Sequence, residues 1–509
     1  MNVRRFKRLL PVLVFLAALH SIAAAEPLRF RVELATNVAK QPVTGRLYVF
    51  LSRRSPEPRF GPDWFRPEPF FGEDVDGLMP GTTAEIDAQS DAFPAPLSKL
   101  PAGEYRVQAV LDHSFDEPQP GRAAGNFYSA AVRANLDADQ SGTVPLVLDR
   151  VVELPPFPQS PWIEEFPVRS RLLSEFHGRE VIEPSAVVLP AGYHTEPDRR
   201  YPVIYVIPGF SGSHRDLARG YLYGPPAAGA GEVDFIRVLL SGQCKWGHHV
   251  FANSATNGPR GDALVRELIP AVERQYRTIP AATARFVTGH SSGGWASLWL
   301  QVNYPETFGG VWSLAPDPVD FRDFQKVDLY AEPPLSLFRD PQGNPRPIAR
   351  RGLEPALWYE PFVGMDDVLK YGGQFRSFEA VFSPLGDDRA PAKICDRTTG
   401  QIDAGIAEAW QAYDIRLLLK RNWSRLGPRL AGKLHITAAG QDTFYLEGAV
   451  KLLADTLREL GSDAEVTIIP GADHSSLLTA KLHRENRLQM SRVFLQHHPI
   501  GGELVPAVR

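Results

Sequence analysis

The chain has 509 residues, which is too long for one ordinary hydrophobic core and favours two or three domains. Its 43% hydrophobic and 22% charged residues exclude an intrinsically disordered protein. The formal net charge of −4 provides none of the basic surface that a nucleic-acid-binding protein needs, so no nucleic-acid partner is expected.

Residues 1–25 have the pattern of a secretory signal peptide. The basic segment RRFKR precedes the apolar segment LLPVLVFLAALHSIA, and three alanines before Glu26 resemble a cleavage site. The apolar segment is short for a membrane span and no second one follows, so a retained anchor is the weaker alternative. We therefore expect a periplasmic or secreted protein with no membrane span after cleavage. Loss of four basic residues leaves 51 basic and 59 acidic residues, a charge of −8.

The two cysteines, Cys244 and Cys395, leave two alternatives open. In an oxidising compartment an even pair can form a disulfide, and this one would close a long loop. Two unrelated buried thiols are equally compatible with the sequence.

Residues 27–153 show short strand patterns and no long helical pattern. The segments LRFRVEL, GRLYVFLS, GEYRVQAVLD and TVPLVLDRVVEL are rich in β-branched and aromatic residues and are bounded by Gly and Pro. They predict a β-sandwich of immunoglobulin-like size. The Pro- and Phe-rich segment 55–74 is expected to be an exposed loop, and the Pro-rich segment 154–164 a linker.

From residue 165 to residue 498, strand patterns alternate with helical ones. The predicted strands are SAVVLP, YPVIYVIPG, HHVFANS, ARFVTGH, GGVWSLAP, KLHITAAG and AEVTIIPG. This alternation predicts an α/β domain with a mostly parallel sheet covered on both faces. Residues 317–430, between the fifth and sixth of these strands, are rich in Pro, Gly and aromatic residues. We call this segment the cap insert and expect it to cover the carboxyl edge of the sheet.

The segment ARFVTGHSSGGWASLWL places a serine where a strand turns into a helix. Gly289-His290-Ser291-Ser292-Gly293 fits the pattern G-x-S-x-G only with Ser291 at the centre. A nucleophilic serine in such a turn has strained backbone angles, and glycines are needed where side chains would collide. A serine cap in a glycine-rich turn is the alternative. Ser292 is the weaker candidate nucleophile, but its backbone N–H falls where a developing oxyanion is stabilised.

A serine nucleophile needs a base, and the base needs an orienting carboxylate. In an α/β domain with its serine in such a strand-to-helix turn, the chain order of the three residues is serine, acid, histidine. Asp442 follows the strand KLHITAAG, and His474 follows the strand AEVTIIPG, so both should reach the edge where Ser291 lies. We expect His290 to point away from the site. The turn Gly209-Phe210 is the candidate for a second oxyanion donor. Its sequence is equally compatible with a plain glycine-rich turn.

Several segments together resemble the Putative esterase family of the α/β-hydrolase superfamily. They are RRYPVIYVIPGFSGS, DALVRELIPAVERQYR, FVTGHSSGGWASLWLQVNYPETFGGVWSLAP and PGADHSSL. That family includes esterase D (S-formylglutathione hydrolase), feruloyl and acetylxylan esterases, enterochelin esterases and mycolyltransferases. The resemblance implies an α/β-hydrolase fold with Ser291 as nucleophile, Asp442 as acid and His474 as base. It also implies an oxyanion hole made by the backbone amides of Phe210 and Ser292.

The sequence therefore predicts a serine esterase acting on a small-molecule or glycan ester, with no cofactor and no metal. An acyltransferase with the same triad and a non-catalytic glycan- or partner-binding protein are the alternatives. The N-terminal domain and the cap insert depart from the family pattern, so the acyl and alcohol groups do not carry over. The oligomeric state and the role of the N-terminal domain are likewise left open.

Overall fold

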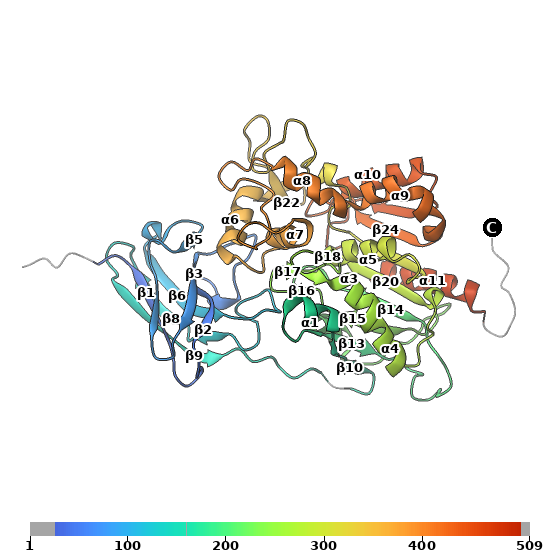
Figure 1. Cartoon of the computed structure of the whole chain (residues 1–509), viewed down its shortest axis with the longest axis horizontal. Helices are drawn as coiled ribbons and strands as arrows, with labels where there is room; N and C mark the ends of the chain where they lie inside the picture. The colour runs from blue at the N-terminus through green and yellow to red at the C-terminus, as the bar shows by residue number, and fades with distance from the viewer. Residues whose placement is uncertain (1–25, 159, 500–509) are drawn as a thin grey trace, which may run out of the picture.

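The structure of the chain is a computed structural model that describes residues 26–158 and 160–499. The predicted signal peptide lies outside the described residues. Figure 1 shows an N-terminal β unit beside a larger α/β unit. None of the helices in the described ranges combines the length and apolar character that crossing a bilayer requires.

The N-terminal unit is one hydrogen-bonded sheet of nine strands. In space the order is β4-β1-β9-β7-β6-β2-β3-β5, with β8 pairing with β6. The bounds are β1 Arg29–Leu34, β2 Val43–Ser52, β3 Phe70–Leu78, β4 Thr83–Ile86, β5 Asp91–Phe93, β6 Gly103–Asp112, β7 Phe127–Ser129, β8 Val132–Leu136 and β9 Thr143–Val151. The four strands predicted from the sequence correspond to β1, β2, β6 and β9.

This sheet folds over its own core. Strands β1 and β3 lie five positions apart in the sheet, about 24 Å in a flat sheet. The rings of Phe30 in β1 and Phe71 in β3 nevertheless have centroids only 6.2 Å apart. Alternate residues of β1, β2, β6 and β9 fill the enclosed core. Because all nine strands belong to one sheet, the expected immunoglobulin-like sandwich of two sheets is not confirmed.

The second unit contains a mixed sheet of eight strands in the order β10-β13-β15-β14-β20-β21-β24-β25. The bounds are β10 Ile163–Glu165, β13 Ser185–Val188, β14 Val203–Ile207, β15 Ile236–Leu240, β20 Arg285–His290, β21 Gly310–Leu314, β24 Leu434–Ala439 and β25 Glu465–Ile469. Strands from β15 to β25 in this order are parallel to their neighbours, whereas β10 and β13 pair antiparallel. The chain between β13 and β14 contains no helix that could form a parallel crossover, so the sheet is less uniformly parallel than expected.

Helices cover both faces of this sheet. Ile204, Phe286 and Trp312 pack against Met490 and Phe494 of α11 on one face. Their sequence neighbours Tyr205, Val287 and Val311 point to the opposite face, into the main core that also contains α5 and α10. The helices are α1 Arg171–His177, α2 His214–Ala218, α3 Arg260–Ala263, α4 Ile269–Gln275, α5 Ser292–Asn303, α9 Ile415–Leu430, α10 Glu447–Glu459 and α11 Ala480–His497.

One predicted strand is wrong. The segment HHVFANS does not enter the sheet, because Val250 and Phe251 have positive φ angles of 44° and 50° and form a turn. The strand at that place in the sheet is β15, formed by the preceding segment IRVLL. Two short antiparallel pairings follow β15 in the chain: β16 Gln243–Cys244 with β17 Gly247–His248, and β18 Asn253–Ser254 with β19 Gly258–Pro259. A third small pairing joins β11 Val168–Arg169 and β12 Ile182–Glu183.

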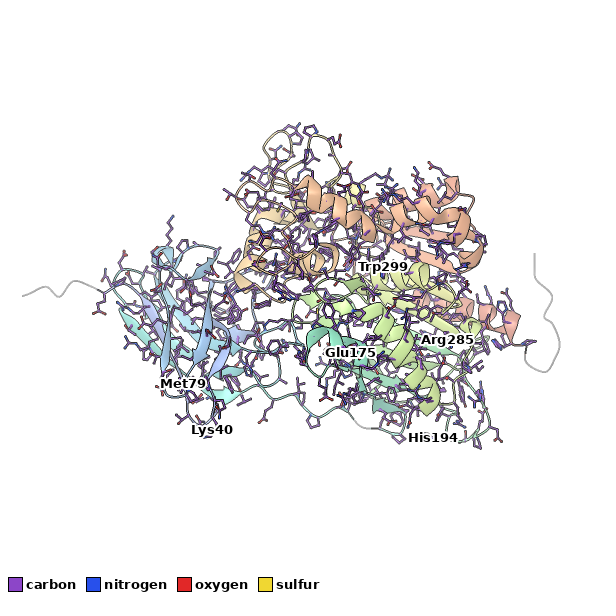
Figure 2. All side chains as sticks on the ribbon, viewed as in Figure 1. Lys40, Met79, Glu175, His194, Arg285 and Trp299 are labelled. Atoms are coloured by element: carbon purple, nitrogen blue, oxygen red, sulfur yellow. The ribbon has the colours of Figure 1, made fainter. Side chains whose placement is uncertain are left out.

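The cap insert contains the hairpin β22 Pro347–Arg351 and β23 Glu354–Trp358, followed by α6 Tyr359–Leu369, α7 Gln374–Phe382 and α8 Ala404–Trp410. In Figure 1, α6 and β22 lie between the N-terminal sheet and the helices over the second sheet. Its final helix, α9, packs on α5 and α10, so it belongs to the helical layer of the sheet. Trp299 of α5, labelled in Figure 2, stacks on Trp295 and on Tyr413 of the insert.

The N-terminal sheet is docked on the end of α6. Tyr48 donates a hydrogen bond of 2.5 Å to the carbonyl of Leu369. The guanidinium of Arg46, only 3% exposed, donates to the Val368 carbonyl at 2.8 Å and pairs with Asp74 and Asp91. Tyr48, Phe50 and Phe70 belong to the same hydrophobic core as the α/β unit. The two units therefore share a packed, hydrogen-bonded interface.

Candidate active site

Ser291 lies in a strained turn between β20 and α5. Its backbone angles are φ 61° and ψ −126°, a region that residues with side chains rarely adopt. Strand β20 ends at His290, and α5 begins at Ser292. The side chain of Ser291 is therefore presented at the carboxyl edge of the sheet, as the sequence pattern predicts for a nucleophile elbow.

The flanking glycines are required by close backbone contacts. A Cβ atom on Gly289 would lie 2.2 Å from the carbonyl oxygen of Gly293. A Cβ atom on Gly293 would lie 2.3 Å from the Ile207 carbonyl oxygen and 2.5 Å from that of Pro208. Any side chain at these two positions would push α5 away from β14 and β20. This agrees with the steric reason for the glycines in the sequence motif.

His474 and Asp442 form a buried hydrogen-bonded pair. Nδ1 of His474 lies 2.8 Å from Oδ2 of Asp442, which is 0% exposed. The other carboxylate oxygen of Asp442 accepts a bond of 2.8 Å from the backbone N–H of Phe444. An ionised carboxylate can only accept, so the Nδ1 proton of His474 is held in this bond and Nε2 is left to act as a base.

Arg350 of the cap insert holds the loop that carries Asp442, a contact that the sequence did not indicate. Its Nε donates to the Asp442 carbonyl at 2.8 Å, and its guanidinium pairs with Glu447 at 2.6 Å. Its backbone N–H donates to the carbonyl of Thr443. The acid loop is thus fixed from a segment about 90 residues earlier in the chain.

His290 does not point away from the site, and this expectation is wrong. Its ring centroid lies 4.4 Å from that of His474, and its Nε2 lies 2.9 Å from the His474 carbonyl oxygen. Burial, together with the neighbouring His474, lowers the pKa of His290 to about 4. The imidazole is therefore neutral near pH 7, and its Nε2–H donates to the carbonyl. His290 is the last residue of β20, and the regular alternation of side chains in a strand does not extend into the strained turn at Ser291.

Ser291 and His474 line one cavity of about 250 Å³. Aromatic side chains form much of its wall, namely Trp64, Phe210, Phe362, Phe378 and Phe444. Within the described residues no hydrogen bond joins Ser291 to His474, and the Ser291 hydroxyl instead donates to Asp317 at 3.4 Å. In substrate-free enzymes such bonds are often long, and a hydroxyl rotation is enough to redirect this one.

The Gly209-Phe210 turn lies beside the serine. A Cβ atom on Gly209 would be 3.4 Å from Ser291 Cβ and 4.0 Å from its Oγ. Ser292 is the first residue of α5, a position whose backbone N–H has no partner within the helix. The two amides assigned by resemblance to an oxyanion hole therefore flank Ser291.

The cap insert contributes part of the cavity wall. Of the aromatic residues Trp358, Tyr359 and Phe362, only Phe362 lines the cavity. Tyr359 is buried in the core, where its hydroxyl donates to the Phe324 carbonyl at 2.8 Å. Asp317 lies beside Ser291, but Asp320 pairs with Arg322 and Arg416 instead.

Asp317 is a buried carboxylate in the wall of the cavity. Burial raises its pKa to about 6, and the hydrogen bond of 2.6 Å from the Ser292 hydroxyl opposes this shift. Gln374 of α7 lies 3.4 Å away. A strongly shifted acid in a cavity is a common feature of functional sites.

The two cysteines are not joined to each other. Cys244 and Cys395 are free, buried thiols, so the disulfide alternative is wrong. Each has its own partner, Asn257 for Cys244 and Arg397 for Cys395. No group of three His, Cys, Asp or Glu side chains in the described ranges is placed to hold a metal ion.

We predict that Asp317→Asn stabilises the protein at pH 8. The usual pKa of an aspartate is 3.8, so the folded protein holds this proton more tightly than the unfolded chain, and stability falls as pH rises from about 4 to about 6. Removing the charge should raise the free energy of unfolding at pH 8 by up to about 3 kcal/mol. Denaturant unfolding at pH 4 and pH 8 measures this, and the gain should vanish at pH 4.

Asp320→Asn is the matched control. Asp320 is also buried, but loss of its charge leaves the guanidinium of Arg416 without its partner. It should destabilise the protein by about 3 kcal/mol or more at pH 8. A loss of stability in Asp317→Asn at pH 8 would contradict the prediction.

Comparison with known proteins covers part of this site. The family model described as Putative esterase matches residues 184–425, which include Ser291 but neither Asp442 nor His474. No curated protein matches the chain.

Three solved structures are similar to part of the chain, each with a TM-score below 0.5. A ferulic acid esterase is 12% identical, with 65% of this chain and 98% of that chain covered and a TM-score of 0.40. An S-formylglutathione hydrolase from Agrobacterium tumefaciens is 13% identical, with 65% and 95% covered and a TM-score of 0.39. FphF, a fluorophosphonate-binding serine hydrolase of Staphylococcus aureus, is 12% identical, with 65% and 98% covered and a TM-score of 0.38. Likenesses this distant transfer no activity, so the family model is the comparison that carries weight: residues 184–425 of the chain match the family described as Putative esterase.

Proposed function

We propose that this protein is an exported serine esterase that cleaves a small-molecule or glycan ester through an acyl-enzyme on Ser291. His474 takes the proton of the Ser291 hydroxyl as the oxygen attacks the ester carbonyl. The backbone amides of Phe210 and Ser292 stabilise the oxyanion of the tetrahedral intermediate. His474 then protonates the departing alcohol, and a water molecule activated by the same histidine releases the acid. Asp442 orients His474 throughout, and no cofactor takes part.

One observation supports this proposal most strongly. The strained Ser291 opens into the same cavity as a histidine whose Nδ1 is held 2.8 Å from a fully buried carboxylate. Burying an aspartate at 0% exposure is costly unless its oxygens are satisfied, and both oxygens of Asp442 are bound. An arrangement that only stabilised the fold would not need a serine with positive φ at the mouth of an apolar cavity.

We predict that Ser291→Ala abolishes hydrolysis of p-nitrophenyl acetate, whereas Ser292→Ala retains most of kcat. Only the backbone of Ser292 takes part in the reaction, and its hydroxyl serves Asp317. Initial rates at pH 7.5 measure both variants, and intact mass spectrometry should find the acyl group only on proteins that contain Ser291. Comparable loss in the two variants would contradict the assignment of the nucleophile. Adding an alcohol to the assay distinguishes hydrolysis from acyl transfer, since a transferase would form the new ester in place of free acid.

We predict that Asp442→Asn lowers kcat by about 10⁴-fold, as loss of the orienting acid does in other triads. An asparagine can present its N–H₂ to Nδ1, which favours the wrong tautomer of His474. Glu447→Gln is the control, because Glu447 begins α10 directly after the loop of Asp442 but pairs with Arg350 rather than with the histidine. Near-normal activity of Asp442→Asn would move the acid elsewhere.

We also predict that the mature protein begins at Glu26 when the full chain is expressed in a bacterium with a periplasm. The proposal of export depends on the basic and apolar segments of residues 1–25 and the alanines before Glu26. N-terminal sequencing of the protein from the periplasmic fraction checks this. An intact N-terminus in the cytoplasmic fraction would refute it.

A further inference from the structure

One wall of the cavity beside Ser291 comes from outside the α/β unit. Trp64 lines this cavity together with Ser291 and His474, yet it belongs to the segment between β2 and β3 of the N-terminal sheet. The segment 55–74 was expected to be an exposed loop, and for Trp64 this is wrong. The family model begins only at residue 184, so this contribution is not part of the family's shared structure.

Trp64 is held by three aromatic rings of the α/β unit. Its ring centroid lies 5.2 Å from that of Phe362 and 6.1 Å from that of Phe444, in both cases edge to face. It lies 5.5 Å from the ring of Phe210. Such pairs stabilise a contact beyond the apolar area that they bury. Phe444 in turn packs edge-on against His474, with centroids 5.0 Å apart.

Trp64 also separates two cavities. A second cavity of about 70 Å³ lies at the interface of the two units, between Arg59 and Pro118 on one side and Leu369 and Gly372 on the other. Trp64 and Phe210 are the two residues that line both cavities. The indole and the ring of Phe210 therefore form a partition between the two cavities, and removing the indole would open space from the larger cavity toward the smaller one.

The position of this partition is fixed by the docking of the N-terminal sheet. The hydrogen bonds of Arg46 and Tyr48 to the end of α6 hold the sheet, and Gln119 donates to the Ser211 hydroxyl at 2.9 Å. Ser211 directly follows Phe210 in the turn beside Ser291. The N-terminal unit thus touches the site at the aromatic wall and at the turn.

We propose that the N-terminal unit is a specificity element of the active site, in which Trp64 closes the cavity so that it accepts a compact apolar group of the ester and excludes a long chain. The inference rests on the proposed esterase function and adds the class of substrate. A cavity of about 250 Å³ is at the small end for ligand sites and has room for a short or branched group. The aromatic walls favour an apolar one.

The test compares long and short esters in Trp64→Ala. Two series are used, p-nitrophenyl acetate against p-nitrophenyl octanoate, and methyl acetate against octyl acetate, so that the acyl and alcohol sides are both examined. We expect Trp64→Ala to raise the long-to-short ratio of kcat/KM at least tenfold in one series. Trp64→Phe, which keeps a smaller ring in the same place, should give an intermediate ratio.

Phe65→Ala is the matched control. Phe65 is the next residue, packs against Arg351 at 4.9 Å and lines neither cavity. Its ratios should stay within twofold of the wild type. Unchanged ratios in Trp64→Ala in both series, or equal changes in Phe65→Ala, would overturn the proposal.

A binding measurement separates this proposal from the proposed esterase function. In the Ser291→Ala background, which is not expected to cleave the ester, adding Trp64→Ala should lower the Kd for p-nitrophenyl octanoate or for octyl acetate at least tenfold. If the wild type cleaves none of the esters but one of these shifts in Kd is found, the esterase function fails and the role of Trp64 stands. If the esters are cleaved and neither Kd changes, the role of Trp64 fails alone.

Discussion

The positive φ angle of Ser291 is the constraint on which the site depends. A residue with a side chain adopts this conformation at a cost of about 1–3 kcal/mol, so the surrounding structure must enforce it. Here the enforcement is mutual packing: α5 is buried along almost its whole length, and its second residue, Gly293, touches the carbonyls at the end of β14. Moving α5 by the width of a methyl group would relax the turn and withdraw the hydroxyl from the cavity.

The cap insert connects the strained turn to the rest of the molecule. Its hairpin supplies Arg350, which fixes the loop of Asp442, and its helix α6 ends in the carbonyls that receive Arg46 and Tyr48. Its residues Phe362 and Phe378 line the cavity between these two anchors. The same segment therefore positions Asp442, shapes the cavity and docks the N-terminal sheet. These three sets of contacts account for the close packing of such a long insert.

The sequence was sufficient wherever the signal is local. Strand β20, the glycines around Ser291 and the aspartate and histidine after β24 and β25 follow from short patterns and chain order. The inward orientation of His290 could not be read this way, because side-chain alternation stops at the strained turn. The contacts of Trp64 and Arg350 join residues that lie far apart in the sequence, and no periodic sequence pattern predicts such contacts. The composition of HHVFANS predicts a strand, but its backbone angles form a turn. The strand at this place, β15, is formed by the segment that precedes it.

The pairing of His474 with Asp442 near the end of the chain has a consequence for how the protein comes into being. Ribosomes deliver the N-terminal sheet first and the histidine last, with the serine turn between them, so the contact of Trp64 with Phe362 and the meeting of Ser291 with His474 in one cavity both join distant parts of the chain. Folds dominated by such contacts form slowly, because long loops must close before the contacts stabilise them. A nascent or partly folded chain accordingly holds Ser291 without His474, so the proposed reactivity would arise only as the last step of maturation.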